Sequence, residues 1–288
     1  MAAAAASFAS LAPTELGPAQ HASKIVEKPA AEPFVSQRIS VMVQGSGPDV
    51  ILIPGLTASR DMWKGTVAAI PGYRYHLVQV NGFAGTKAGA NVEGPLVEPL
   101  ASEIARYIRH SGLKSPALVG HSMGGTLAMK VAARQPEIVG RVMVVDMLPQ
   151  PAGLFGGNAS IIAPIATSLR NALTGTQAGR RLLTNLINGY GADNGNRESD
   201  PDVVARAMHE LALTDLAPEL PKIGVPMTVL FASPAAGTPE HARIAANYRS
   251  AYAGAKGAKL KAVPDSGHMI MYDQPERFRA ELKAFLAR

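Results

Sequence analysis

The segment Gly120-His121-Ser122-Met123-Gly124-Gly125 constrains the fold of this 288-residue chain more than any other part of it. It follows a short apolar run over 116–120 and precedes a helical pattern over 123–134. Small residues two positions before and after the serine allow a tight, strained turn from strand to helix. Such a turn lifts the Ser122 hydroxyl above the strand end and aims the positive end of the helix at the same point. The segment therefore predicts a nucleophilic serine; the alternative is a glycine-rich turn with a spectator serine.

Strand-like and helix-like segments alternate along most of the chain. Short apolar or alternating runs of strand length are separated by longer runs whose apolar residues recur at helical spacing. The predicted strands cover 35–43, 49–54, 75–80, 116–120, 141–145, 226–231 and 259–263, and the predicted helices cover 59–70, 95–111, 123–134, 238–252 and 274–287. This alternation predicts an α/β fold with a mostly parallel central sheet and helices on both faces.

The stretch 147–214 interrupts this alternation, because it contains no convincing strand. It offers amphipathic helical segments near 159–173, 177–188 and 201–213, with a polar loop over 191–197. We expect it to be a helical cap inserted between two parts of one core, 35–146 and 215–288, and residues 1–34 to be a flexible N-terminal arm. The alternative for 147–214 is a small second domain unrelated to the site.

With these features, residues 35–288 resemble the α/β-hydrolase family, in the form of serine esterase/lipase-like hydrolases with a helical cap. The resemblance implies an oxyanion hole built from two backbone N–H groups. One belongs to Met123, directly after the nucleophile, and the other to Leu56, in the loop that leaves the strand at 49–54. Many relatives carry His-Gly where this chain has Pro54-Gly55. The departure leaves the donor intact, because the donor is main chain.

His268 is the histidine that the resemblance implies as general base. It ends the run Pro264-Asp265-Ser266-Gly267-His268, directly after the last predicted strand, where the family places its catalytic histidine. A base there can take the serine proton during attack. His121 adjoins Ser122 in sequence, but we expect its side chain to point away from the hydroxyl and pack below the turn in a structural role.

The acid that orients His268 is the least obvious member of the predicted triad. The family most often takes it from the loop after the strand at 226–231, and that loop holds no Asp here. Asp146 ends the strand at 141–145, where an unpaired buried carboxylate would be costly, and the order Ser122, Asp146, His268 matches the family. Asp146 is therefore the predicted acid; the alternatives are Glu240, Asp265, Asp215, or no acid at all.

Composition limits the remaining possibilities. The chain has no cysteine, which excludes disulfides, thiolate nucleophiles and Cys-ligated metals. It has no metal-binding, P-loop or dinucleotide motif, so we predict no cofactor and no metal. The net charge of +6 comes from scattered Lys and Arg, which favours a basic surface over a nucleic-acid module. No apolar stretch is long enough for a membrane span. An apolar, small-residue N-terminus leaves the compartment open: cytoplasmic, or periplasmic or secreted if it is a trimmed signal remnant.

The sequence thus predicts a serine hydrolase acting on a small-molecule ester substrate. The expected bond is a small, fairly apolar carboxylic ester or lactone, cleaved through an acyl-enzyme, because the predicted cap is rich in apolar residues. The same triad could serve an amide or C–C bond hydrolase, or an acyltransferase. A non-catalytic ligand-binding relative is the alternative of a different class, and the oligomeric state stays open.

Overall fold

The computed structural model describes residues 1, 32–155, 159–191 and 198–287. The chain separates into two compact units, Met1–Pro33 and Phe34–Arg288. The predicted arm over 1–34 lies almost wholly outside the described residues, as does most of the predicted polar loop over 191–197. All of the described helices and strands belong to the second unit.

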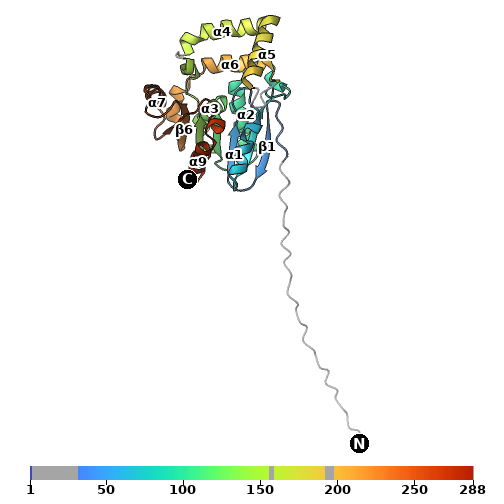
Figure 1. The fold of residues 1–288 in the computed structure, drawn as a ribbon. Helices are drawn as coiled ribbons and strands as arrows, with labels where there is room; N and C mark the ends of the chain where they lie inside the picture. The colour runs from blue at the N-terminus through green and yellow to red at the C-terminus, as the bar shows by residue number, and fades with distance from the viewer. Residues whose placement is uncertain (2–31, 156–158, 192–197, 288) are drawn as a thin grey trace. The chain divides into compact units, whose positions relative to one another are not determined.

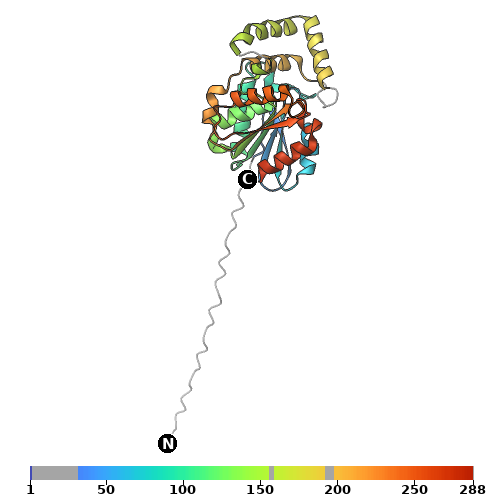
Figure 2. The same ribbon diagram turned by 60° about the vertical axis from the view of Figure 1, so that its left-hand side comes forward.

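A seven-stranded sheet forms the centre of this unit (Figures 1 and 2). Its strand order is β1-β3-β2-β4-β5-β6-β7, and every pair is parallel except β1 with β3. The strands are β1 Ile39–Gly45, β2 Asp49–Ile53, β3 Arg74–Val80, β4 Ala117–His121, β5 Arg141–Val145, β6 Met227–Ser233 and β7 Lys259–Pro264. The predicted α/β class with a mostly parallel sheet is confirmed.

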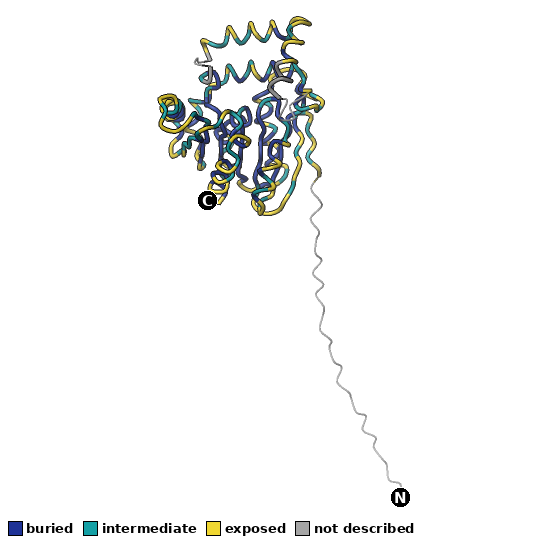
Figure 3. Tube along the Cα trace, viewed as in Figure 1, coloured by how far each residue is buried: buried dark blue, intermediate teal, exposed yellow. Residues whose placement is uncertain are grey.

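Helices cover both faces of the sheet because the strand side chains alternate between two apolar layers. In β2, Ile51 and Ile53 face one layer, whereas Val50 and Leu52 face the other. The helices that pack in the first layer are α2 Val97–His110, α3 Met123–Arg134 and α7 Pro239–Ala251. The elements that pack in the second layer are η1 Arg60–Trp63, α1 Lys64–Ala69, α8 Ile270–Asp273 and α9 Pro275–Leu286. Figure 3 shows the sheet as the most buried part of the chain.

Several element boundaries differ from the sequence predictions, and β1, β6 and the helix at 59–70 illustrate the causes. β1 runs over Ile39–Gly45, not 35–43, because it pairs with the whole of β3 and ends where Gly45 takes a φ of 82°. β6 extends to Ser233, where it still pairs with Pro264 of β7. The predicted helix 59–70 begins as a 3-10 turn, and the Ser59 hydroxyl caps this turn by accepting a hydrogen bond from the Asp61 N–H.

The stretch between β5 and β6 holds η4 Pro151–Phe155 and three helices: α4 Ala159–Gly175, α5 Gln177–Gly191 and α6 Pro201–Leu213. In Figures 1 and 2, α6 lies next to the core and α4 lies beyond it, on the far side from the sheet. The remaining short 3-10 turns are η2 Gly89–Asn91, η3 Pro136–Ile138 and η5 Ala217–Lys222. Among the helices described, none is long and apolar enough to span a bilayer.

Two side chains of α6 bind it to the core. The Glu210 carboxylate accepts hydrogen bonds of 2.8–3.0 Å from the N–H groups of Leu96 and Val97, at the N-terminus of α2. A carboxylate is favoured there because the first N–H groups of a helix lack internal partners and carry positive partial charge. The Arg206 guanidinium donates to the carbonyls of Asn91 and Val92. These bonds fix α6 over one end of the sheet.

Candidate active site

Ser122 occupies a strained turn between β4 and α3. Its backbone has a φ of 53° and a ψ of −123°, a conformation that costs energy for a non-glycine residue. The Ser122 N–H donates to the carbonyl of Val145 at 2.9 Å, which ties the turn to β5. A Cβ on Gly120 would lie 2.1 Å from the Gly124 carbonyl oxygen, and one on Gly124 would lie 2.3 Å from that of Ile53. Only glycine therefore fits at both positions.

His268 and Asp146 contact each other although 122 residues separate them in the sequence. The Nδ1 of His268 lies 2.7 Å from Oδ2 of Asp146. An ionised carboxylate can only accept, so Nδ1 carries the hydrogen and Nε2 is left as the basic nitrogen of the neutral ring. Asp146 directly follows β5, and His268 lies between β7 and α8. Parallel strands end at the same edge of the sheet, and this explains why the two residues meet.

Asp146 is held by more than the histidine. Its Oδ1 accepts a hydrogen bond of 2.9 Å from the Ala232 N–H and one of 3.0 Å from the Tyr248 hydroxyl. Burial, and next to it the negative charge of Asp146, hold the pKa of Tyr248 well above its ordinary value. Tyr248 therefore remains a hydrogen-bond donor. With the N–H of His268 included, three donors satisfy a carboxylate that is only 8% exposed.

The other carboxylates considered for the acid lie elsewhere. Glu240 is exposed on α7 and pairs with Arg243 at 3.5 Å. The Asp215 carboxylate accepts from the Ala217 N–H at 2.9 Å and so shapes the start of η5. Asp265 is exposed. Of the carboxylates weighed from the sequence, the structure brings only Asp146 to His268.

The two predicted oxyanion donors flank Ser122. Met123 is the first residue of α3, and Leu56 lies in the turn that follows β2. Within the described chain, neither backbone N–H has a protein acceptor. The loop approaches the nucleophile closely, since a Cβ on Gly55 would lie 3.1 Å from Cβ of Ser122. Two free N–H groups next to a serine can stabilise an oxyanion.

Tyr248 and the Ala232 N–H are contacts of the acid that sequence reasoning missed. Tyr248 lies on α7 and Tyr252 is the residue directly after that helix, and both are buried. The Tyr252 hydroxyl donates to the Met147 carbonyl at 2.6 Å, beside the acid. Two tyrosines at i and i+4 indicate a buried helix face. That spacing alone does not reveal that their hydroxyls meet the residues around Asp146.

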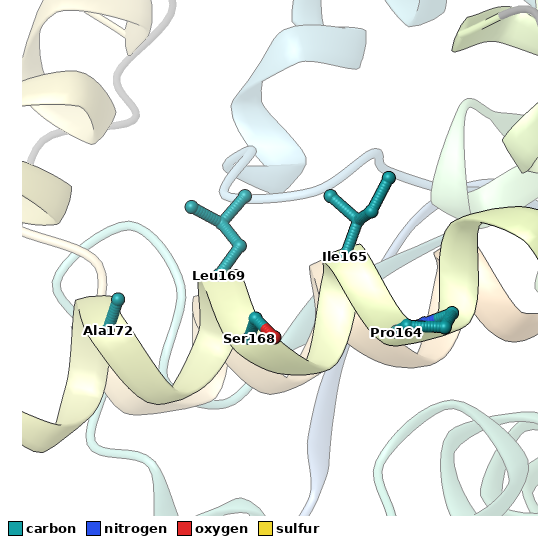
Figure 4. A pocket seen from close by; sticks show the side chains of 5 residues that line it. All are labelled: Pro164, Ile165, Ser168, Leu169 and Ala172. Carbon is teal, nitrogen blue, oxygen red and sulfur yellow. The ribbon is translucent and has the colours of Figure 1, made fainter.

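A shallow depression of about 500 Å³ lies on α4 rather than at Ser122. Only residues of α4 line it, namely Pro164, Ile165, Ser168, Leu169 and Ala172 (Figure 4). Its lining is almost wholly apolar and includes no residue of the triad. The depression is thus a feature of the α4 surface and is separate from the residues of the candidate site.

Comparison with known proteins gives the family to which this fold belongs. Residues 50–281 match the profile described as the Alpha/beta hydrolase family, so the chain belongs to that family. The resemblance predicted from the sequence is thereby confirmed.

Curated relatives and solved structures agree with this membership. The chain is 28% identical over 208 residues to an sn-1-specific diacylglycerol lipase of Mus musculus, covering 66% of this chain and 65% of that one. It is 33% identical over 112 residues to the pimeloyl-[acyl-carrier protein] methyl ester esterase of Aeromonas hydrophila, covering 38% and 42%. The chain thus spans less than two thirds of the length of these two relatives, and a third match, to a putative esterase/lipase of Haemophilus influenzae, spans 20% of that protein.

Two solved structures share the fold at low sequence identity. An enol-lactonase from Burkholderia xenovorans matches with a TM-score of 0.61 and 19% identity, over 87% of this chain and 96% of that one. A thermophilic esterase from Thermogutta terrifontis matches with a TM-score of 0.65 and 20% identity, over 86% and 93%. At these identities the likeness concerns the fold.

Proposed function

We propose that this chain is a serine hydrolase that cleaves small, fairly apolar carboxylic esters, lactones included, through an acyl-enzyme. The observation that carries the proposal is the 2.7 Å contact between His268 and Asp146, which leaves a basic Nε2 on the histidine. The strained turn at Ser122 and the unpaired N–H groups of Leu56 and Met123 support it. Catalytic histidines need such an orienting carboxylate to keep the correct tautomer.

In the proposed reaction the Ser122 Oγ attacks the ester carbonyl carbon while Nε2 of His268 takes the hydroxyl proton. The carbonyl oxygen becomes an oxyanion and accepts hydrogen bonds from the N–H groups of Leu56 and Met123. The tetrahedral intermediate then collapses: the bond to the leaving alkoxide breaks and His268 returns the proton to it. Water, deprotonated by His268, attacks the acyl-enzyme in the same way, releases the acid and restores Ser122.

The nature of the cap supports an apolar acyl or alcohol group. We propose that residues 147–214 act as a cap on the core formed by 35–146 and 215–288, with η4 and α4–α6 as its helical parts. Residues 147–191 are rich in Leu, Ile and Ala, and Arg170, Arg180 and Arg181 are their only charged residues, which favours an apolar substrate group. The names of the diacylglycerol lipase, the methyl ester esterase and the enol-lactonase fit an ester or lactone bond.

A p-nitrophenyl ester series from acetate to octanoate, with a matched p-nitroanilide and a lactone, tests this proposal. We expect the esters and the lactone to be hydrolysed, the anilide to be much slower, and Ser122→Ala to show only background activity. Glu240→Gln, an exposed change on α7, serves as the control. Wild-type activity equal to that of Ser122→Ala on every substrate would favour the non-catalytic ligand-binding alternative. Anilide turnover above ester turnover would favour an amidase.

A further inference from the structure

His121 is a buried histidine that the reaction above does not use. It ends β4, directly before Ser122, and is 3% exposed. Its Nε2 lies 2.9 Å from the backbone carbonyl oxygen of His268. Because a carbonyl oxygen only accepts, Nε2 carries the hydrogen and donates it. The two imidazole rings also pack together, with centroids 4.6 Å apart.

The second ring nitrogen of His121 faces a different loop. Nδ1 is buried and has no partner among the described residues. A Cβ on Gly55 would lie 2.9 Å from it, so the imidazole touches the loop that presents Leu56. Burial, and next to it the proximity of His268, lower the pKa of His121 to about 3. The ring of His121 therefore stays neutral, and its Nδ1 faces Gly55 without a hydrogen.

A loop histidine needs more than one anchor to hold its ring over a serine. The Asp146 carboxylate fixes the ring of His268 through Nδ1, and the Asp273 carboxylate accepts from the neighbouring Gly267 N–H at 2.9 Å. Neither contact joins His268 directly to the strand that carries Ser122, because Asp146 follows β5 and Asp273 belongs to α8. The bond from His121 supplies that relation, because His121 and Ser122 are consecutive on one backbone.

We propose that His121 is a positioning residue that sets the distance of both His268 and the Gly55–Leu56 loop from Ser122. This inference rests on the proposed function, since it concerns the alignment of that triad. His121 touches no substrate atom. It fixes the relative positions of three segments. These are the turn at Ser122 to which it belongs, the loop of His268 through its hydrogen bond, and the loop of Leu56 through its contact with Gly55. A misplacement of about 1 Å can cost about 10²-fold in rate.

The test compares two replacements of His121 on a p-nitrophenyl butyrate assay. His121→Phe keeps a ring but removes the donor, and we expect kcat to fall by about 10²-fold while KM stays unchanged. His121→Gln keeps an N–H donor of similar reach, and we expect it to recover most of the lost kcat. His110→Phe, the same replacement at an exposed histidine on α2, is the control and should match the wild type. Thermal unfolding of each variant shows whether it is folded.

Gly55→Ala perturbs the same contact from the opposite side and leaves the hydrogen-bonding groups of His121 intact. Its new Cβ would stand 2.9 Å from Nδ1, so either the imidazole or the loop must shift. We expect a lower kcat here as well, even if His121→Phe does not fold. An inactive Ser122→Ala together with wild-type kcat in His121→Phe or in Gly55→Ala overturns the positioning role alone. A fully active Ser122→Ala overturns the proposed function, and the positioning role with it.

Discussion

The sheet edge that holds Ser122, Asp146 and His268, here called the catalytic edge, and the helix α4 of the cap differ in how tightly their side chains are held. At the catalytic edge, Asp146 accepts three hydrogen bonds and is 8% exposed. On α4, Ile165 and Leu169 are 61% and 50% exposed, although both are apolar. Hydrogen bonds hold Asp146 in one arrangement, whereas α4 exposes apolar side chains to solvent. Figure 3 colours much of α4 as exposed or intermediate.

We infer from this difference that the catalytic edge performs the proposed reaction and that the outer face of α4 takes no part in it. Reaction rate depends on preorganised groups, and these lie at the ends of buried parallel strands. The cap is fixed to the core mainly through α6, by Glu210 and Arg206, while α4 packs on α6. We expect changes at the catalytic edge to remove activity without unfolding the chain, and changes on the outer face of α4 to leave both activity and stability nearly unchanged.

The largest effect should come from Asp146→Asn. The amide keeps the shape of the carboxylate but cannot hold the required tautomer of His268, so kcat should fall by about 10⁴-fold. Measured kcat on p-nitrophenyl butyrate, with Glu240→Gln as the control, tests this. Full activity in Asp146→Asn would mean that another residue orients the base.

On α4, we expect two leucines one turn apart to behave differently. Leu173 is 7% exposed and Leu169 is 50% exposed. Leu173→Ala should lower the free energy of unfolding by about 2–3 kcal/mol, because it leaves a cavity in the α4–α6 contact. Leu169→Ala should change it by less than about 0.5 kcal/mol. Urea unfolding of both variants gives the comparison; equal losses would show that a partner covers the outer face of α4.

A smaller effect on activity is expected from Tyr248→Phe. It removes one of the three donors to Asp146, and a hydrogen bond to a charged group contributes about 1.5–3 kcal/mol. We expect kcat to fall by roughly 10-fold, well short of the Asp146→Asn effect. Tyr252→Phe, which loses bonds to the Met147 carbonyl and the Met129 sulfur but none to Asp146, is the matched control. If both variants lose the same activity, the effect reflects packing of α7 and not the acid.

A further expected effect concerns acid stability. The pKa of His121 is about 3 in the folded chain and 6.5 ordinarily. Between these two pH values the unfolded chain therefore binds a proton at this residue and the folded chain does not. The contribution of His121 to the free energy of unfolding is therefore greatest above pH 6.5 and declines as the pH falls from 6.5 towards 3. His121→Gln has no such group, and its melting temperature should fall less between about pH 7 and about pH 5 than that of the wild type. An identical slope in both proteins would contradict the lowered pKa.

Local pattern was enough to predict most of the fold. The predicted helices at 123–134 and 201–213 and the strand at 141–145 match α3, α6 and β5 residue for residue. Their signals are strong because apolar periodicity and the glycine-flanked serine are local properties of the sequence. Boundaries failed where pairing with another strand decides them, as in β1, whose extent is set by β3.

The candidate site was less accessible to sequence reasoning, because its contacts join distant segments. Position in the family pattern pointed to Ser122 and His268, and the cost of burying a carboxylate pointed to Asp146. Nothing local could indicate that Tyr248 donates to Asp146, or that His121 donates to the His268 carbonyl. Those bonds depend on how α7 and the loop after β7 return to the same edge, which only the assembled sheet determines.

Labelling with a fluorophosphonate tests the central claim most directly, because the probe forms a covalent bond with an activated serine and needs no knowledge of the substrate. We predict that peptide mass spectrometry of the labelled protein places the adduct on Ser122, and that Ser122→Ala and Asp146→Asn label far more slowly. The buried Ser233, which lies 3.0 Å from Nδ1 of His241, should remain unlabelled. An adduct on Ser233 or another residue, or equal labelling of wild type and Ser122→Ala, would contradict the account.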